Sequence, residues 1–219
     1  MRLFGGQTPT DMDASDLMLA TLYRRPFSDP EWLYEIKYDG FRCLILKAGA
    51  SVDLFSRNGN LFNGSFPEIV DAVSRVPGDF AWDAELTVDD ATGRPSFERL
   101  QRRAVTRTAR NVRAAAGADP ARLYVFDALS VDGEDLRRLP LLERKERLRE
   151  SFDDTRTLIY ASGVQAAGEF VFEQAQSLDL EGMVAKRLDS TYQKGRSRDW
   201  LKIKHAGYSR AAALGFGRK

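Results

Sequence analysis

The sequence predicts an α+β fold with mainly antiparallel, strongly curved sheets and flanking helices. Of its 219 residues, 43% are hydrophobic and 30% are charged, which is the balance of a folded domain with a substantial core. Segments with period-two alternation are interspersed with amphipathic segments of helical period. The chain shows no internal repeat and no regular strand–helix–strand rhythm, so a purely parallel sheet is not expected.

The expected elements follow from these two periodicities. Alternation predicts strands at residues 32–37, 41–48, 51–56, 80–88, 123–130, 157–161, 181–187 and 200–204. Helical spacing predicts helices at 66–76, after Ser96, at 141–151 and at 164–178. The first of these is opened by Ser65 and Pro67. We expect residues 1–31 to be irregular, and we expect the Ala/Gly-rich residues 111–120 to form a mobile loop.

One stretch combines a lysine with a tight turn: Glu35-Ile36-Lys37-Tyr38-Asp39-Gly40-Phe41-Arg42. The Asp-Gly pair predicts a turn between two strands. Alternation places Glu35 and Lys37 on one face of the first strand, close to that turn. A lysine in such a place can be a nucleophile if its surroundings hold it partly neutral. The alternative is a solvated lysine beside a hairpin turn.

Composition excludes several kinds of chemistry. Cys43 is the only cysteine, so neither a disulfide framework nor a cysteine-based zinc site is possible. His205 is the only histidine, which argues against Ser-His-Asp hydrolysis and multi-histidine metal sites. Neither a signal peptide nor a membrane-spanning run is evident, so a cytoplasmic protein is expected, acting as a monomer.

The net charge is only +1, so a nucleic-acid surface would have to come from local clustering of charge. Four arginines after Ser96 follow helical spacing: Arg99, Arg103, Arg107 and Arg110. Such a stripe could contact DNA phosphates. A solvated helix face explains the same pattern equally well, and both interpretations stay open here.

Six motifs in order resemble the nucleotidyltransferase domain of ATP-dependent DNA ligases, a family similar to RNA ligases and mRNA-capping enzymes. They are Lys37-Tyr38-Asp39-Gly40-Phe41-Arg42, Ser56-Arg57-Asn58-Gly59, Trp82-Asp83-Ala84-Glu85-Leu86, Tyr124-Val125-Phe126-Asp127, Glu181-Gly182-Met183-Val184-Ala185-Lys186 and Trp200-Leu201-Lys202-Ile203-Lys204. The resemblance covers residues 15–204. It is greatest to small bacterial ligases and to the ligase modules of bacterial end-joining proteins, and it implies an adenylation fold of the ATP-grasp-like kind.

The resemblance also implies the chemistry. Lys37 would attack the α-phosphate of ATP, and AMP would pass to a 5′-phosphate at a nick or break in duplex DNA. The residues implied to bind ATP or AMP are Glu35, Ile36, Lys37, Arg42, Arg57, Glu85, Phe126, Lys186, Lys202 and Lys204. Glu85 and Glu181 would hold Mg²⁺ or Mn²⁺. Taken singly, Phe126 could equally be core and the carboxylates could be solvated surface groups.

Three alternatives stay open at the level of sequence. The same motifs suit an RNA ligase or a capping-type guanylyltransferase, and a non-catalytic DNA-end-binding accessory module could keep the same pocket. Family ligases continue into an OB-fold domain, which we expect to be absent from residues 1–219. We therefore expect self-adenylation to be the weakest step, with an OB-fold domain or other repair proteins supplied in trans.

Overall fold

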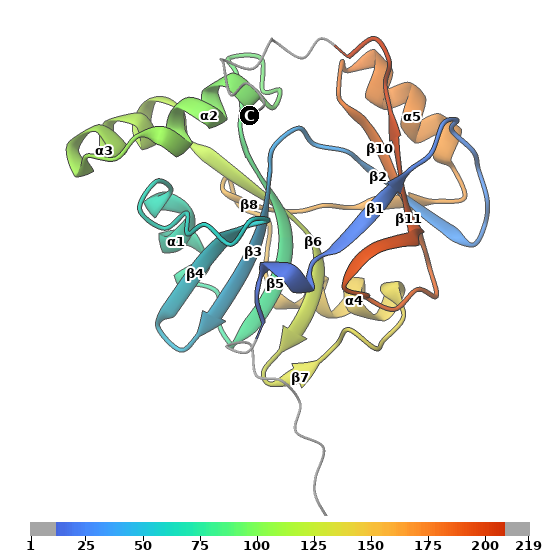
Figure 1. The fold of residues 1–219 in the computed structure, drawn as a ribbon, viewed down its shortest axis with the longest axis horizontal. Coiled ribbons are helices and arrows are strands. Elements are labelled where there is room, and N and C mark those ends of the chain that lie inside the picture. The colour runs from blue at the N-terminus through green and yellow to red at the C-terminus, as the bar shows by residue number, and fades with distance from the viewer. Residues whose placement is uncertain (1–11, 209–219) are drawn as a thin grey trace, which may run out of the picture.

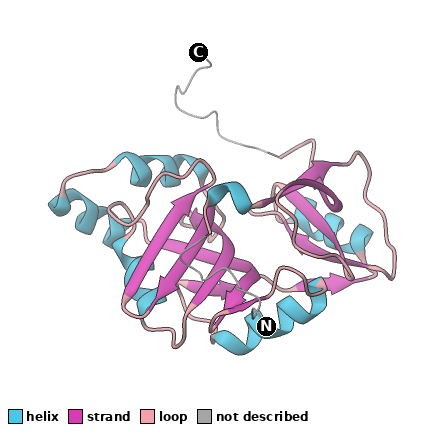
Figure 2. Ribbon diagram, turned by 60° about the horizontal axis from the view of Figure 1, so that its bottom comes forward, coloured by secondary structure: helices cyan, strands magenta, loops and turns pink. Residues whose placement is uncertain are grey.

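The protein consists of two β-sheets that lie side by side, with helices on their outer sides (Figures 1 and 2). The structure is a computed structural model and describes residues 12–208. One sheet has five strands in the order β1-β11-β10-β2-β9, and the other has the order β4-β3-β5-β6-β7, with β8 beside β6. Only β1 with β11 and β6 with β8 pair in parallel among the described strands. The predicted α+β class with mainly antiparallel sheets is confirmed.

The elements have the following bounds. The five-stranded sheet comprises β1 (Met18–Leu22), β2 (Trp32–Ile36), β9 (Gly163–Gln165), β10 (Gly182–Arg187) and β11 (Gly195–Lys204). The other sheet comprises β3 (Phe41–Ala48), β4 (Ser51–Ser56), β5 (Phe80–Val88), β6 (Ala121–Val131), β7 (Glu134–Asp135) and β8 (Leu158–Tyr160). The helices are η2 (Ala14–Asp16), α1 (Pro67–Ser74), α2 (Phe97–Val105), α3 (Ala109–Ala118), α4 (Leu141–Ser151) and α5 (Gly168–Ser177).

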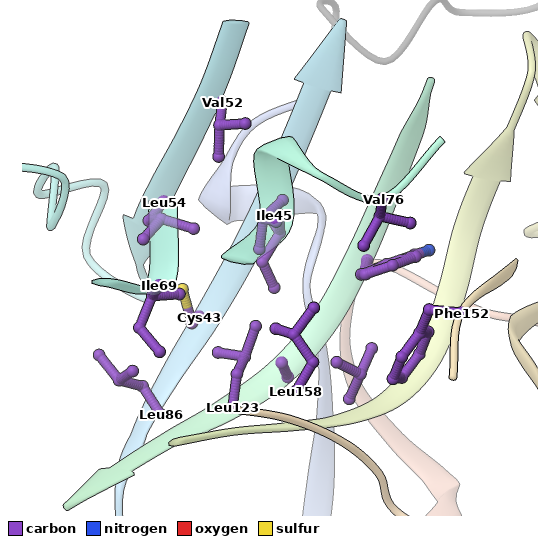
Figure 3. Close-up of a cluster of buried hydrophobic side chains, with 14 of the residues drawn as sticks. Cys43, Ile45, Val52, Leu54, Ile69, Val76, Leu86, Leu123, Phe152 and Leu158 are labelled. Carbon is purple, nitrogen blue, oxygen red and sulfur yellow. The ribbon is translucent and has the colours of Figure 1, made fainter. Parts of the chain in front are cut away.

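The largest core cluster lies on the outer face of the β3-β5-β6 sheet (Figure 3). The alternation of β5 places Trp82, Ala84 and Leu86 on this face, where all three are fully buried. Helix α1 covers the cluster with Ile69 and Val73. Side chains of one parity on β3, β4 and β5 therefore form the core, as the period of a strand requires. On β6 the parity changes after Val125, where the pairing with β5 shifts register.

A second cluster joins the two sheets. Leu44 of β3 and Leu129 of β6 pack there with Met18 of β1 and Trp200 of β11. A third cluster lies on the far face of the five-stranded sheet, where Val171 of α5 packs with residues of β2, β10 and β11. The inner faces of the two sheets thus contact each other through apolar side chains. Polar side chains near the ends of these strands can then form a site.

Two segments expected to lack regular structure are ordered elements. Met18–Leu22 is strand β1, which pairs with β11, so the expectation that residues 1–31 are irregular is wrong for this part; residues 1–11 lie outside the described residues. Residues 111–120 are not a mobile loop, because helix α3 spans Ala109–Ala118 and buries Val112. The alanine content of α3 favours a helix in spite of Gly117.

The helix expected at 164–178 begins later than predicted. Gly163–Gln165 form strand β9, and Ala166, at a φ of 63°, separates it from α5. Of the apolar residues in this segment, Val171 and Ala175 are buried, whereas Phe170 and Leu178 are exposed. Helix α1 spans Pro67–Ser74 and is shorter at both ends than the predicted 66–76, with Phe66 rather than Ser65 at its N-cap. Within residues 12–208, no helix has the length and apolar character needed to cross a membrane.

Candidate active site

A cleft of about 760 Å³ opens between the two sheets, with lining residues from strands of both. The lining includes nine of the ten residues predicted to bind ATP: Glu35, Ile36, Lys37, Arg42, Arg57, Glu85, Phe126, Lys186 and Lys202. Lys204, the tenth, does not line the cleft but forms an ion pair with Glu181, 2.8 Å away. The fold therefore brings together side chains that are up to 167 positions apart in sequence, from Glu35 to Lys202.

Lys37 follows strand β2 and forms an ion pair with Glu181. Its backbone N–H donates to the carbonyl of Gly182 at 2.9 Å, which fixes the chain beside β10. The second oxygen of Glu181 accepts from Lys204. Burial would raise the pKa of Glu181, but the charges of Lys37 and Lys204 outweigh burial and lower it. Glu181 is thus an ionised carboxylate held directly against the amine of Lys37.

Two glycines bring the backbone close enough to assemble this corner. Gly182 has a φ of 135°, and a Cβ there would lie 2.1 Å from the carbonyl oxygen of Ile203. A Cβ on Gly40 would lie 2.3 Å from the carbonyl oxygen of Leu86. Only glycine fits both places without moving the neighbouring strand. The N–H of Gly40 donates to Glu85 at 3.2 Å, so the turn after Lys37 also orients this carboxylate.

Glu85 lies on β5 opposite Arg42 of β3 and faces the cleft. Burial raises its pKa to about 7, in spite of the opposing charges of Lys37 and Arg42. The nearby charge of Glu181 adds to this increase. Glu85 is therefore a carboxyl group that titrates close to neutral pH next to the lysine.

Phe126 is half-buried and lines the cleft, in contrast to its buried neighbours Val125 and Asp127 on β6. The guanidinium of Arg42 lies 4.5 Å from its ring centroid, and Nζ of Lys186 lies 4.3 Å from it. Trp200 meets the ring edge-on at a centroid distance of 6.0 Å. The position combines packing against the inter-sheet cluster with an exposed part of the ring, so a planar group could stack on it.

Arg42 is held by a buried network that the sequence did not indicate. It donates to both oxygens of Asp83 and, at 2.9 Å, to the carbonyl of Met18. The hydroxyl of Tyr192 also donates to Asp83 and accepts from the N–H of Met18 at 3.0 Å. Burial raises the pKa of Asp83, an effect that the charge of Arg42 opposes. The network links β1, β3, β5 and the loop before β11 behind the cleft.

Three further cationic side chains line the cleft. Arg57 lies in the exposed turn after β4, and Lys202 and Arg196 come from β11. Burial lowers the pKa of Lys202, and the charges of Lys204 and Lys37 lower it further. Sequence reasoning missed Arg196. Strand alternation from Trp200 and Lys202 could have found it, because all three positions have the same parity.

Glu35 is 3% exposed and forms ion pairs with two lysines. Its Oε1 accepts from Lys145 of α4 at 2.6 Å, and its Oε2 accepts from Lys186 at 2.7 Å. Lys186 is almost fully buried, and burial lowers its pKa to about 8 even though Glu35 opposes this. Lys145 was absent from the predicted site because no periodic or motif signal connects helix 141–151 with β2.

The four arginines predicted to form one helical stripe do not do so. Arg103 is 1% exposed, and its guanidinium donates to Glu68 at 2.7 Å and to the carbonyl of Ser65 at 3.0 Å. It also donates to the carbonyl of Asp119 at 2.6 Å. These bonds tie α1, α2 and the end of α3 together. The prediction is wrong for Arg103, because a buried guanidinium cannot reach DNA phosphates.

The other three arginines lie on different elements. Arg99 of α2 forms an ion pair with Asp119 at 2.6 Å. Helix α2 ends at Val105, so Arg107 lies in the turn that follows, where it donates to Ser65 Oγ. Arg110 is exposed on α3. Helical spacing therefore does not place these side chains on one face.

The carboxylates near Lys37 suit a divalent cation of the magnesium type. Among residues 12–208, no cluster of three or more His, Cys, Asp or Glu side chains could hold a metal without a substrate. Mg²⁺ binds through one or two carboxylates together with waters and substrate phosphates. Glu85 and Glu181 supply two such carboxylates, and burial raises the pKa of Glu85.

The two-sheet fold and a cleft that holds a lysine among carboxylates and cations define a nucleotidyltransferase domain. A family model described as ATP dependent DNA ligase domain matches residues 17–204. The chain belongs to this family, which confirms the resemblance to ATP-dependent DNA ligases. The match also favours a DNA ligase domain over an RNA ligase, a capping enzyme or a non-catalytic module.

Relatives and solved structures agree with this assignment. The SPbeta prophage-derived DNA ligase-like protein LigB of Bacillus subtilis is 30% identical over 92% of this chain and 72% of its own length. The multifunctional non-homologous end joining protein LigD of Pseudomonas aeruginosa is 34% identical over 91% of this chain but only 23% of its own length. The ligase domain of M. tuberculosis LigD has a TM-score of 0.73 at 27% identity, covering 86% of this chain and 60% of that one. A mycobacterial DNA ligase D complexed with ATP and MES gives a TM-score of 0.70 at 26% identity, with the same coverage of both chains.

Proposed function

We propose that this chain transfers adenylate through Lys37 and seals nicks or breaks in duplex DNA. The Nζ of Lys37 attacks the α-phosphorus of ATP, a P–N bond forms, and the bond to the β-phosphate breaks to release pyrophosphate. The AMP then passes to a 5′-phosphate, and a 3′-hydroxyl displaces it to form the phosphodiester. The observation that carries this proposal is the position of Lys37 in the cleft, between the carboxylate of Glu181 and a wall of cations.

The attack requires that Lys37 lose a proton. Glu181 accepts a hydrogen bond from the amine and orients it, but the lowered pKa of this carboxyl group makes it a weak base. Glu85, with a pKa raised to about 7, is the nearby carboxyl group that can exchange a proton at neutral pH. Lys37 is therefore a nucleophile oriented by Glu181, with Glu85 as the candidate base.

The base of the nucleotide fits the inner end of the cleft. The exposed part of the Phe126 ring offers a stacking surface, and the carboxylate of Glu35 offers acceptor atoms to an amino group. The phosphates fit the outer wall, where Arg57, Lys202 and Arg196 supply positive charge. Charge from fixed cations stabilises the transferring phosphoryl group without reorganisation.

Glu85 and Glu181 would hold Mg²⁺ or Mn²⁺ beside the phosphates. A bound divalent cation would neutralise part of the triphosphate charge. Glu181 has two cationic partners, Lys37 and Lys204, so it can exchange one of these ion pairs for a contact with the divalent cation. Glu85 is oriented towards the same corner by the N–H of Gly40.

The proposal is tested by nick sealing. The chain is incubated with ATP, Mg²⁺ and a labelled nicked duplex, and the joined strand is measured in a single turnover. We expect joining by the wild type and none by Lys37→Ala, whereas Lys47→Ala serves as a control because Lys47 donates to Gly78 outside the cleft. Joining by Lys37→Ala at the wild-type rate would contradict the proposal.

The proposal extends to the substrate and to the partners of the chain. We propose that nicked or broken duplex DNA is the substrate, that an OB-fold domain or other repair proteins act with the chain in trans, and that the chain is a cytoplasmic monomer. Adding such a domain in trans should increase the rate of sealing, because correct alignment of reacting groups is worth about 100-fold in rate.

A further inference from the structure

The carboxylate of Glu35 forms ion pairs with two lysines that come from different elements. Lys145 of α4 binds Oε1 at 2.6 Å, and Lys186 of β10 binds Oε2 at 2.7 Å. Each carboxylate oxygen has two lone pairs, so each can still accept one more hydrogen bond. With both oxygens anchored, the carboxylate can neither rotate nor retreat from the cleft that it lines.

Lys145 itself does not line the cleft. Its side chain is 5% exposed, and its Nζ also donates to the carbonyl of Ala161 at 2.5 Å. The ring of Tyr160 lies 4.5 Å from the same Nζ. A longer contact of 3.5 Å joins Nζ to the carbonyl of Phe126. These partners enclose the ammonium group behind the cleft, so it acts on a nucleotide through the lining residues that it holds, and Glu35 is the one whose side chain it binds.

A purely structural explanation for Lys145 is weak. Buried ion pairs contribute little net stability compared with well-packed apolar groups. In addition, Glu35 already has the charge of Lys186 as a partner. What the second lysine adds is a fixed orientation and a persistent negative charge on a carboxylate that faces the cleft.

We propose that Lys145 is a positioning residue for base selection, which holds Glu35 as a fixed, ionised acceptor for the 6-amino group of a purine. The inference rests on the proposed function and assigns nucleotide choice to a residue outside the cleft. An ionised carboxylate only accepts hydrogen bonds, so it pairs with a 6-amino donor. A 6-oxo group places a second acceptor against it, which leaves both groups unpaired and in repulsion.

The test compares ATP with inosine triphosphate, whose base carries oxygen in place of the 6-amino group. The rate of covalent adduct formation is measured with each nucleotide for the full chain and its variants. Lys145→Met should lower the ATP-to-ITP ratio of kcat/KM by ~10-fold, the effect of one well-placed polar contact. Lys145→Arg retains the charge and donor groups and should keep the ratio within ~3-fold of the wild type.

Lys47→Met is the matched control. Lys47 is also 5% exposed and donates to the carbonyl of Gly78, far from Glu35, so its loss should affect stability without changing the ratio. Both nucleotides are measured on the same preparation, so the ratio is independent of the folded fraction. If Lys145→Met is insoluble, Lys145→Gln replaces it.

The outcomes separate this inference from the proposed function. An unchanged ratio in Lys145→Met, or an equal fall of the ratio in Lys47→Met, would overturn the role of Lys145. Absence of any adduct in the wild type would instead overturn the proposed function. An ATP-to-ITP ratio that falls in Lys145→Met but stays near the wild-type value in Lys145→Arg supports the inference. A loss of packing would not depend on the charge of the side chain in this way.

Discussion

Phe126 takes part both in the cleft and in the packing between the sheets, and its two roles can be separated by experiment. Its ring is half-buried against Trp200 and has cations on it from Arg42 and Lys186. Stacking of a base on an aromatic ring is worth about 1–3 kcal/mol. Phe126→Ala should therefore raise the KM for ATP by ~10-fold or more, with only a moderate fall in melting temperature.

The control for Phe126 is another phenylalanine that is buried far from the cleft. Phe152 lies in the outer core cluster, so Phe152→Ala should lower the melting temperature and leave the KM for ATP unchanged. The measurement is adduct formation against ATP concentration, with thermal denaturation in parallel. A normal KM in Phe126→Ala together with a collapse of stability would show that Phe126 is only part of the core.

Lys186 makes stability depend on pH in a defined direction. Burial depresses its pKa in the folded protein to about 8, below the 10.5 of an unperturbed lysine. The unfolded chain then binds more protons between these values, so the free energy of unfolding should rise as pH increases from about 8 to about 10. Above this window Lys186 is neutral in both the folded and the unfolded protein, so burial of its charge no longer lowers the free energy of unfolding.

The comparison with Lys186→Met isolates this effect. Urea denaturation of both proteins at pH 7 and pH 10 should show that wild-type stability, relative to the variant, increases by on the order of 2 kcal/mol at the higher pH. In the variant, Glu35 keeps Lys145 as its ion-pair partner. A relative stability that falls or stays level between the two pH values would contradict the burial argument.

At the scale of elements, the arginine-rich segment is two helices that one buried guanidinium holds together. Arg103 donates to the Ser65 and Asp119 carbonyls and forms an ion pair with Glu68. Arg103→Met leaves these acceptors without their donor and should destabilise the fold by about 2–3 kcal/mol. Arg102 is exposed and pairs only within its helix, so Arg102→Met should change stability by no more than about 0.5 kcal/mol.

The measurement is urea denaturation of both variants, together with DNA binding at low salt. If Arg103→Met proved as stable as the wild type but bound DNA more weakly, the structural role given to Arg103 would be wrong. This test does not involve Arg110, which lies on α3 and is exposed to solvent.

Strand alternation predicted the central elements well because their burial follows the same period. Strand β5 shows this most clearly, since Trp82, Ala84 and Leu86 face the core and Asp83 and Glu85 face inward towards the site. Strand β1 was missed because it pairs in parallel with β11, a partner 176 residues away. Helix α3 is not predicted by these patterns because Gly117 signals a loop, whereas the run of alanines before it favours a helix.

At the scale of the whole molecule, local motifs located the chemistry but not the scaffold behind it. Lys37, Glu85 and Glu181 each belong to a short motif, so the placement of the two carboxylates near Lys37 could be predicted. Lys145 lies 110 residues from Glu35, and Tyr192 lies 109 residues from Asp83. No periodic signal connects such pairs, because their contact depends on how the two sheets are placed relative to each other.

The distribution of charge over the molecule supports Lys37 as the site of covalent attachment. The net charge is +1, yet the cleft gathers Arg57, Lys186, Arg196 and Lys202 from three segments. Cations with nearby carboxylates are what a triphosphate and its divalent cation require. The position of Lys37 within this field makes the lysine, rather than a carboxylate, the expected site of covalent attachment.

The mass of the protein after incubation with ATP and Mg²⁺ tests this central claim most directly. Intact-mass spectrometry should show one adenylate per chain, and peptide mapping should place it on Lys37. The adduct should be absent from Lys37→Arg, which keeps the positive charge but not the nucleophilic amine, and present in Lys47→Arg. An adenylate that persists in Lys37→Arg, or that maps to Lys186 or Lys202 in the wild type, would contradict the account.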